Sequence, residues 1–596
     1  MSVTHRTSVF AVSRGIAFCA ALFAGVPYAT AQLSASMTYT VSMPRPADHL
    51  FHVKLRCDGL RGEFHDFQMP AWAPGYYRLL DFEKNVSSFH AEDGAGRTLP
   101  FEKVTKNAWR IVTSGASSLV VNYDVLGTVS FAVQNFLNEN RALLSPPGLF
   151  LYEVGQLGRP VTIEIQAPEG WKSIATGLDA APGRAGVFTA ANFDVLFDSP
   201  VSMGNQEMLR FDVNGIPHDV SLENVTPSAD RKRMTADLKR MVETATRLMG
   251  EIPYSHYAFL MVGAGNGGVE HLNSASIAFN GNSLGTEEGY LRWLSYVAHE
   301  YFHNFNVKRI RPIALGPFDY EAENLTNMLW VSEGLSVYYQ DLLLVRAGLM
   351  TREQYLDKLA VAIARFENAP GHRYQSATES SWTTWGTSGV GNDRNTTISY
   401  YDNGSMLGAM LDLAIRAHSQ NRKSLDDVMR ALYRTYYKSK QRGFTDAEFR
   451  AACEEAAGGP LDEVFDYAST TRAADYSKYL ALAGLETKIG AEDAPGAYLG
   501  ANFQVHGSVL AVTSVDAGSP AESAGLRPGD QFAETVKTLS EMLNARKAGD
   551  TIRLHGAREI EVTLGKYTKR TWTIRPAPHA TDPQTAILHD WLRSRQ

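Results

Sequence analysis

The chain has 596 residues, of which 44% are apolar and 20% are charged, and this composition is ordinary for a soluble globular protein. At about 150 residues per domain, its length predicts three or four domains. The net charge of −7 argues against nucleic acid or an anionic membrane surface as a partner.

The N-terminus is typical of an export signal. Arg6 and Arg14 precede an apolar run from Ile16 to Val26, and Ala29-Thr30-Ala31 offers a small-residue cleavage site. The run is about half of the ~20 residues that a membrane span needs. We therefore expect residues 1–31 to be a signal peptide, and the mature chain to be periplasmic or secreted, with no membrane span.

Residues 32–222 alternate apolar and polar side chains in short runs separated by Gly and Pro. This pattern predicts an all-β, sandwich-like N-terminal domain. Its clearest strands are expected at residues 37–41, 51–55, 119–123 and 161–165. A loop from Met69 to Tyr77 carries Pro70, Pro74 and Gly75, and it is either a packed aromatic turn or a contact to substrate.

Residues 223–487 change to a helical periodicity and predict a mainly helical domain with a little sheet. A long helix is expected up to Met249, then a buried strand at 257–262 and a glycine-rich turn. Further helices are predicted near 325–347, 352–367, 403–419, 424–437 and 445–456.

The pattern returns to β at residues 488–577, and residues 578–596 form a tail with one short helix. Gly518 to Asp530 resembles the small-helix and turn signature of a PDZ domain. PDZ domains hold the C-terminus of an extended peptide against a sheet edge, so such a peptide is a possible partner. The fold class is therefore multidomain α+β, with a PDZ-like β domain at the end.

The segment His299-Glu300-Tyr301-Phe302-His303 carries the strongest chemical signal. Apolar residues at 291, 294, 297 and 298 predict that it lies on an amphipathic helix. Four residues advance about 400° on a helix, so His299 and His303 share a face and can bind one Zn²⁺ ion, with Glu300 beside a bound water.

A zinc site needs a third protein ligand, and two regions compete to supply it. Glu323, two positions after Glu321, is separated from His303 by nineteen residues, and this spacing matches well-known enzymes with this motif. However, the connection contains Pro312, Gly316 and Pro317, so its residue count has little geometric meaning. Glu333 sits in an apolar helix, where an unpaired carboxylate would be costly, and we favour it.

Trp330-Val331-Ser332-Glu333-Gly334 resembles the ligand helix of gluzincin aminopeptidases, whose pattern is Trp-x-x-Glu-Gly. The chain as a whole resembles the glycyl aminopeptidase family, zinc peptidases with a β domain, a thermolysin-like catalytic domain and a C-terminal PDZ domain. The segments that carry this resemblance are 69–75, 268–271, 299–312, 330–334, 338–339, 399–401 and 411–416. Val269 and Asn403 depart from the usual residues, but neither replaces a metal ligand or a proton-transfer group.

The resemblance implies roles for further residues. Glu300 would take a proton from water and pass it to the leaving amine, and Tyr401, or else Tyr400, would stabilise the oxyanion. Glu270, with Gly268 beside it, would bind the free amino group of the substrate. We thus expect an aminopeptidase that prefers small N-terminal residues, Gly or Ala.

Two other readings stay open. If Glu270 were only a turn residue, the enzyme could be a zinc endopeptidase of similar fold. In the other reading, the metal site is vestigial and the PDZ-like domain acts as a peptide-binding adaptor. The set of both histidines, Glu300, a ligand carboxylate and a tyrosine argues against the adaptor, because a binding protein needs none of them.

Overall fold

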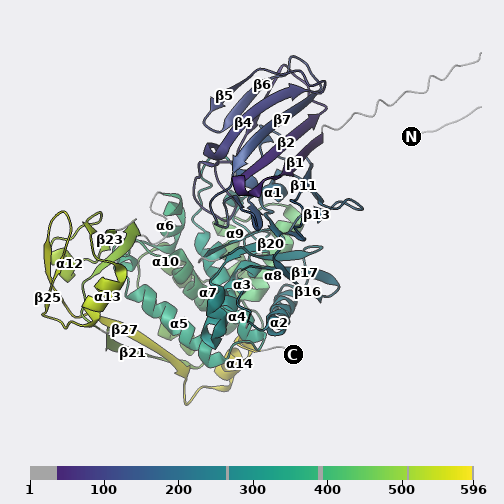
Figure 1. The fold of residues 1–596 in the computed structure, drawn as a ribbon. Helices are drawn as coiled ribbons and strands as arrows, with labels where there is room; N and C mark the ends of the chain where they lie inside the picture. Colours follow the sequence, from purple (N-terminus) through teal and green to yellow (C-terminus); the bar gives the residue numbers. More distant parts are fainter. Residues whose placement is uncertain are drawn as a thin grey trace, which may run out of the picture.

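The computed structural model describes residues 36–593 apart from 224, 228, 264–266, 387–392, 495 and 507–508. The expected signal peptide, residues 1–31, lies outside the described residues. The chain forms an N-terminal β region, a mainly helical centre and a C-terminal β region set to one side (Figure 1). The expected multidomain α+β organisation, with a β-rich N-terminal domain before a helical one, is confirmed.

Three sheets build the N-terminal region around one core. The largest has the order β13-β14-β11-β1-β2-β7-β4, and all its pairs are antiparallel except β1 with β11. In β1, every second side chain is buried, which explains why Met37, Tyr39 and Val41 are apolar. The elements are β1 (Ser36–Ser42), β2 (Leu50–Asp58), β3 (Phe64–Gln68), β4 (Val86–Asp93), β5 (Phe101–Thr105), β6 (Ala108–Val112), β7 (Ser118–Leu126), β8 (Phe136–Leu137), β9 (Arg141–Leu144), β10 (Tyr152–Glu153), β11 (Val161–Gln166), β12 (Ser173–Thr176), β13 (Asp179–Ala180), β14 (Val187–Ala190), α1 (Phe193–Phe197) and β15 (Val201–Gly204).

The central domain begins earlier than the sequence predicts. β16 (Glu207–Val213) and β17 (Ile216–Leu222), which the pattern assigned to the N-terminal domain, join a sheet of order β16-β17-β18-β20-β19. Its other strands are β18 (Tyr257–Met261), β19 (Gly267–Glu270) and β20 (Ser274–Ala278). The predicted boundary at residue 222 therefore has to be corrected, because β17 pairs in parallel with β18 across helix α2.

Helices surround this sheet close to the expected positions. They are α2 (Arg231–Met249), α3 (Glu287–Phe302), α4 (Leu335–Arg346), α5 (Arg352–Glu367), α6 (Ala377–Trp382), α7 (Tyr400–His418), α8 (Leu425–Leu432), α9 (Asp446–Ala457), α10 (Asp462–Ser469) and α11 (Tyr476–Ala481). π-helical turns precede α4, at η6 (Trp330–Gly334), and follow α8, at η9 (Tyr433–Lys440). Nothing in local periodicity predicts these π turns.

The loop from Met69 to Tyr77 fastens the N-terminal region to the central domain. The fully buried Trp72 donates its indole N–H to the backbone oxygen of Asp319, at 2.7 Å. Its ring lies among Phe318, Tyr320 and Trp385, with centroid distances of 5.1, 5.9 and 5.0 Å. This loop is thus a packed aromatic turn, and its far end reaches the cavity described below.

The C-terminal β region lies beside helix α5 (Figure 1). It contains β21 (Leu485–Asp493), β22 (Ala501–His506), β23 (Val509–Val515), α12 (Pro520–Ser523), β24 (Gln531–Phe532), α13 (Val536–Asn544), β25 (Thr551–Leu554), β26 (Ile560–Thr563) and β27 (Thr568–Pro576). α14 (Asp582–Trp591) follows and packs back on α7, as the short helix expected in the tail. The PDZ assignment of this region stays a prediction.

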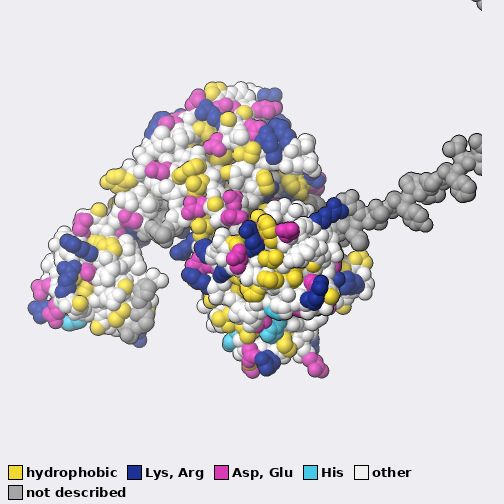
Figure 2. All heavy atoms as spheres, turned by 90° about the horizontal axis from the view of Figure 1, so that it is seen from above, with side chains coloured by type: hydrophobic (Ala, Val, Ile, Leu, Met, Phe, Trp, Pro, Cys, Tyr) yellow, Lys and Arg dark blue, Asp and Glu magenta, His cyan; other side chains and the backbone are white. Residues whose placement is uncertain are grey.

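Charges of both signs are interspersed over the face shown in Figure 2. Within the described part of the chain, no helix is long and apolar enough to cross a membrane.

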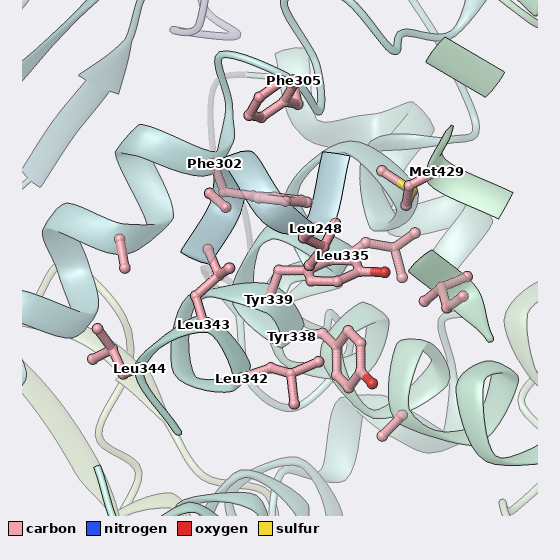
Figure 3. Packing of buried hydrophobic residues seen from close by; sticks show 14 of the residues in the cluster. Leu248, Phe302, Phe305, Leu335, Tyr338, Tyr339, Leu342, Leu343, Leu344 and Met429 are labelled. Carbon is pink, nitrogen blue, oxygen red and sulfur yellow. The ribbon is translucent and has the colours of Figure 1, made fainter. Parts of the chain in front are cut away.

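The core of the central domain has a buried polar network at its centre. Figure 3 shows Leu335, Tyr338, Tyr339 and Leu342 of α4 packed with Phe302 of α3. The hydroxyl of Tyr338 donates to the fully buried Asp412 at 2.6 Å, and Asp412 also accepts from Arg416 Nε at 3.1 Å and the backbone N–H of Leu425 at 2.9 Å. One carboxylate therefore ties α4, α7 and the start of α8 together.

Replacing Asp412 should destabilise the central domain strongly. Asp412→Ala leaves the buried guanidinium of Arg416 unpaired, so the free energy of unfolding should fall by roughly 3–5 kcal/mol. Thermal unfolding of the full chain, followed by circular dichroism, measures this loss. The matched control is Asp212→Ala, at an exposed position of β16, which should change stability by no more than about 0.5 kcal/mol. Equal melting temperatures for the two variants would refute the role of Asp412.

Candidate active site

The two histidines of the motif lie together at the end of helix α3. The side chain of Thr286 caps the start of this helix, and apolar residues at 290, 294, 297 and 298 bury one face. His299 and His303 are 6% and 1% exposed, and their Nε2 atoms are 3.0 Å apart. The helical spacing thus aims both imidazoles at one point, as the sequence predicts.

Glu333, and not Glu323, reaches these histidines. Its Oε2 atom lies 3.2 Å from His303 Nε2 and 3.7 Å from His299 Nε2, and its side chain is buried. Glu323 is exposed on the intervening loop. A tetrahedral zinc ion with bonds of about 2.0–2.1 Å separates its ligand atoms by about 3.3 Å. The separations of 3.0, 3.2 and 3.7 Å bracket this value, so the three residues fit a zinc ion.

Two glycines let the helix that carries Glu333 touch the helix that carries the tyrosines. A Cβ on Gly334 would lie 2.4 Å from the Cα of Gly404, and a Cβ on Gly404 would lie 2.4 Å from the backbone oxygen of Trp330. Both distances are far below van der Waals contact. The glycine in the Trp-x-x-Glu-Gly pattern therefore serves backbone packing, and the π turn places Glu333 at this crossing.

Neighbouring groups fix the orientation of the ligands. His303 Nδ1 lies 2.6 Å from the backbone oxygen of Asn306, which leaves Nε2 free for a metal. The side-chain amide of Asn306 donates to the backbone oxygens of Val331 and Ser332, each at 2.9 Å. Asn306 thus joins the motif helix to the ligand helix.

Tyr77, from the N-terminal region, completes the surroundings of Glu333. Its hydroxyl donates to Glu333 Oε1 at 2.9 Å, while Oε2 faces the histidines. Sequence pattern alone does not single out Tyr77, although the loop that ends there is marked by its Pro and Gly residues. The two residues are 256 positions apart, so local pattern cannot connect them.

Glu300 lies in the same cavity, held by a tyrosine and a glycine. The hydroxyl of Tyr296, one turn earlier on α3, bonds its carboxylate. A Cβ on Gly268 would lie 2.6 Å from Glu300 Oε1 and 2.8 Å from the Tyr296 hydroxyl. Gly268 therefore leaves room for the carboxylate of Glu300, which is a steric role that the sequence did not distinguish from substrate contact.

The two candidate tyrosines differ in their surroundings. Tyr400 is buried, and its hydroxyl lies 3.3 Å from Thr384 Oγ1. Tyr401 is partly exposed, stacks on Tyr400 and places its ring 6.2 Å from that of His299. Tyr401 is the better placed of the two to meet a bound substrate.

Glu270 ends strand β19 and is 4% exposed. Gly75, at φ +89°, packs against it so closely that a Cβ there would lie 2.6 Å from Glu270 Oε2. Glu270 Oε1 has no hydrogen-bond partner among the described residues. A ligand atom of Glu270 lies within 4.8 Å of those of Glu300 and His303. The structure thus brings Glu270 to the metal ligands.

These side chains surround one cavity of about 580 Å³. Its wall comes from both regions: Gly75 to Arg78 and Phe131 belong to the N-terminal region, and the remaining residues, among them Gly268, Glu270, Tyr296, Tyr400 and Tyr401, belong to the central domain.

Burial and neighbouring charges together set the protonation of the site. Burial lowers the pKa of His299 to about 3, which keeps this imidazole neutral, as a metal ligand must be. Burial also opposes the charge of His303, but Glu333 raises the pKa of His303 to about 9. Burial raises the pKa of Glu300 to about 8, with His303 opposing the shift and Glu270 adding to it, so this carboxylate is a stronger base than an ordinary glutamate.

Two family profiles match the chain. Residues 38–205 match the peptidase M61 N-terminal domain, and residues 292–407 match the M61 glycyl aminopeptidase domain. The chain therefore contains both an M61 N-terminal domain and an M61 glycyl aminopeptidase domain. The prediction of a zinc metallopeptidase of the aminopeptidase type is thereby confirmed.

The chain is also similar to solved structures. An aminopeptidase N family protein from Idiomarina loihiensis is 28% identical, with a TM-score of 0.83 over 93% of this chain and 100% of that chain. An M1 zinc metallopeptidase from Deinococcus radiodurans is more distant, with 11% identity and a TM-score of 0.46 over 74% of this chain and 95% of that chain. Curated protein sequences gave no match.

Removing the hydroxyl of Tyr77 should weaken zinc binding. Tyr77→Phe keeps the ring but frees Glu333 Oε1, and the loss of such an outer partner typically lowers metal affinity ~10–100-fold. Competition of the purified protein with a fluorescent zinc chelator measures the affinity directly. The control is Tyr76→Phe, whose ring packs on Phe131 and whose hydroxyl makes no hydrogen bond to Glu333 among the described residues. Equal zinc affinities for the two variants would show that Tyr77 does not orient the ligand.

Proposed function

We propose that this peptidase removes single, small N-terminal residues from peptides that have a free amino group. The observation that carries the proposal is the position of Glu270. Its carboxylate lies in the same cavity as His299, His303 and Glu333, with one oxygen free of hydrogen bonds among the described residues.

The ligand set would hold one zinc ion, which supplies a Lewis acid and an activated water when bound. Glu300 is the proton carrier: its buried carboxylate takes a proton from the attacking water and delivers it to the leaving amine. Tyr296 and Gly268 keep that carboxylate in place during both transfers. Tyr401 donates its hydroxyl hydrogen to the oxyanion that develops on the scissile carbonyl, a bond worth about 3 kcal/mol in comparable sites.

Strand β19 supports binding of a peptide main chain. It is the edge strand of the five-stranded sheet, and Gly267, Gly268 and Glu270 line the cavity. An extended substrate can therefore pair with this edge. Glu270 at the end of the strand then binds the substrate ammonium in a charge-assisted bond, which restricts cleavage to the first residue.

Three further parts of the proposal rest on observations outside the ligand set. The preference for Gly or Ala agrees with the description of the matched family and with the wall beside Glu270, where Tyr76 packs on Phe131. Export to the periplasm or the medium rests on residues 1–31 alone. Binding of a peptide C-terminus to the C-terminal β region rests on its PDZ-like sequence and on the position of β22 at the edge of the sheet β22-β23-β24 in the described part of the chain.

Loss of the Glu300 carboxylate should abolish turnover without loss of metal. Glu300→Gln preserves shape but cannot accept a proton, so kcat for glycyl and alanyl chromogenic amides should fall by ~10²–10⁴. Metal analysis of the same samples should show unchanged zinc. A wild-type enzyme without zinc-dependent turnover would refute the proposed function.

Glu270 should make the enzyme select substrates with a free N-terminal amino group over N-acetylated ones. The wild-type enzyme should cleave alanyl amides and leave the N-acetylated substrates intact. Glu270→Gln should raise KM for the free amine by about 10-fold or more, because the charge-assisted bond is lost. The matched control is Glu323→Gln, which changes an exposed carboxylate. Equally fast cleavage of the acetylated substrate by the wild type would make the enzyme an endopeptidase.

A further inference from the structure

A buried ion pair lies directly behind Glu270 and joins the N-terminal region to the central domain. Lys308 Nζ is 2.9 Å from Asp198 Oδ1, and 3.6 Å from Glu270 Oε1. All three side chains are less than a tenth exposed. Asp198 follows helix α1, whereas Lys308 follows the motif helix. The three groups separate the catalytic cavity from a second one of about 250 Å³, which shares Gly75, Tyr77 and Glu270 with it.

The distances show how Lys308 is shared between the two carboxylates. Its 2.9 Å contact with Asp198 is a hydrogen-bonded ion pair, but 3.6 Å to Glu270 is too long for a hydrogen bond. His271 also holds Asp198, since its Nδ1 lies 3.1 Å from Oδ1 and its Nε2 lies 3.2 Å from Ser276 Oγ. An imidazole that donates from Nδ1 to Asp198 and accepts at Nε2 from the Ser276 hydroxyl satisfies both contacts.

Asp198 and Lys308 each stabilise the charged form of the other. Burial disfavours the charged form of Asp198, but Lys308 and His271 keep its pKa below the usual value. Burial likewise disfavours the ammonium of Lys308, yet Asp198 and Glu270 raise the pKa of Lys308 above its usual value. With Glu270 ionised, two carboxylates and one ammonium leave a net charge of −1, which is the charge that one substrate ammonium neutralises.

We propose that Asp198 is a specificity-determining residue of the N-terminal region, which holds the Lys308 ammonium away from Glu270 so that Glu270 can bind the amino group of the substrate. This inference rests on the role of Glu270 in the proposed function. The ammonium of Lys308 competes with the ammonium of the substrate for Glu270. The ion pair between Lys308 and Asp198 leaves Glu270 available to the substrate. Asp198 and Lys308 are positioning residues, because neither lines the catalytic cavity.

The proposal predicts that removing the charge of Lys308 restores the substrate affinity that is lost when the charge of Asp198 is removed. In Asp198→Asn, Lys308 has only Glu270 as an anionic partner, the cluster becomes neutral, and KM for alanyl amides should rise by ~10-fold or more. The chemical step uses other residues, so kcat should change less than about threefold. In the double variant Asp198→Asn/Lys308→Met, Glu270 is free again with a charge of −1. Its KM should return to within about threefold of the wild-type value.

Asp194→Asn is the matched control, since it removes an aspartate charge from the same helix. Asp194 accepts from the Tyr320 hydroxyl at 2.7 Å, and no contact joins it to Lys308 or Glu270 among the described residues. Its KM should stay within about twofold of the wild-type value. Melting temperatures and zinc content of all variants separate misfolding from weaker amine binding.

The outcomes distinguish the inference from the proposed function. An unchanged KM in Asp198→Asn would overturn the inference, and so would a double variant no better than the single one, because a purely structural ion pair shows no rescue. If Glu270→Gln also leaves the selectivity for free amines unchanged, the proposed amine site itself fails. A raised KM in Glu270→Gln alone would preserve the proposed function and reject only the role of Asp198.

Discussion

The rest of the site depends on the burial of the Glu333 carboxylate beside two imidazoles. A lone carboxylate in this apolar helix would be costly, and His303 holds the pKa of Glu333 below its usual value although burial opposes this. His303 and Glu333 thus stabilise each other's charge, and the ligand atoms of the three residues lie 3.0 to 3.7 Å apart. A divalent cation would take the place of the proton on His303 and bind all three groups, so this buried set favours zinc.

Glycine at the points of closest approach makes this crowding possible. Gly334 and Gly404 let two helices cross in backbone contact, and Gly268 leaves space for the Glu300 carboxylate. Gly75 does the same for Glu270, and its φ of +89° also requires a residue without a Cβ. Four separate segments thus converge on one cavity because each has a glycine where a methyl group would collide. The positions of the catalytic side chains and the close backbone packing therefore depend on the same glycines.

Sequence alone predicted the parts of the site that depend on local spacing. The helical repeat placed His299 and His303 together, and the apolar surroundings of Glu333 selected it over Glu323, against the spacing argument. Residues that act across domains were not found. Tyr77 and Asp198 meet their partners over 256 and 110 positions, and no periodicity encodes such contacts. The same limit explains the boundary error at residue 222, because a strand pattern does not reveal which sheet the strand joins.

The structure therefore gives the N-terminal region a part in the site, in addition to its own core. That core already includes Val269, next to Glu270, and Tyr320 from the central domain, so the hydrophobic core continues across the interface. Trp72 anchors the connecting loop, which carries Gly75 to Glu270 and Tyr77 to Glu333. A displacement of one region relative to the other would disturb the metal ligand and the amine anchor together. The central domain contains the metal ligands His299, His303 and Glu333, yet the orientation of Glu333 depends on Tyr77 of the N-terminal region.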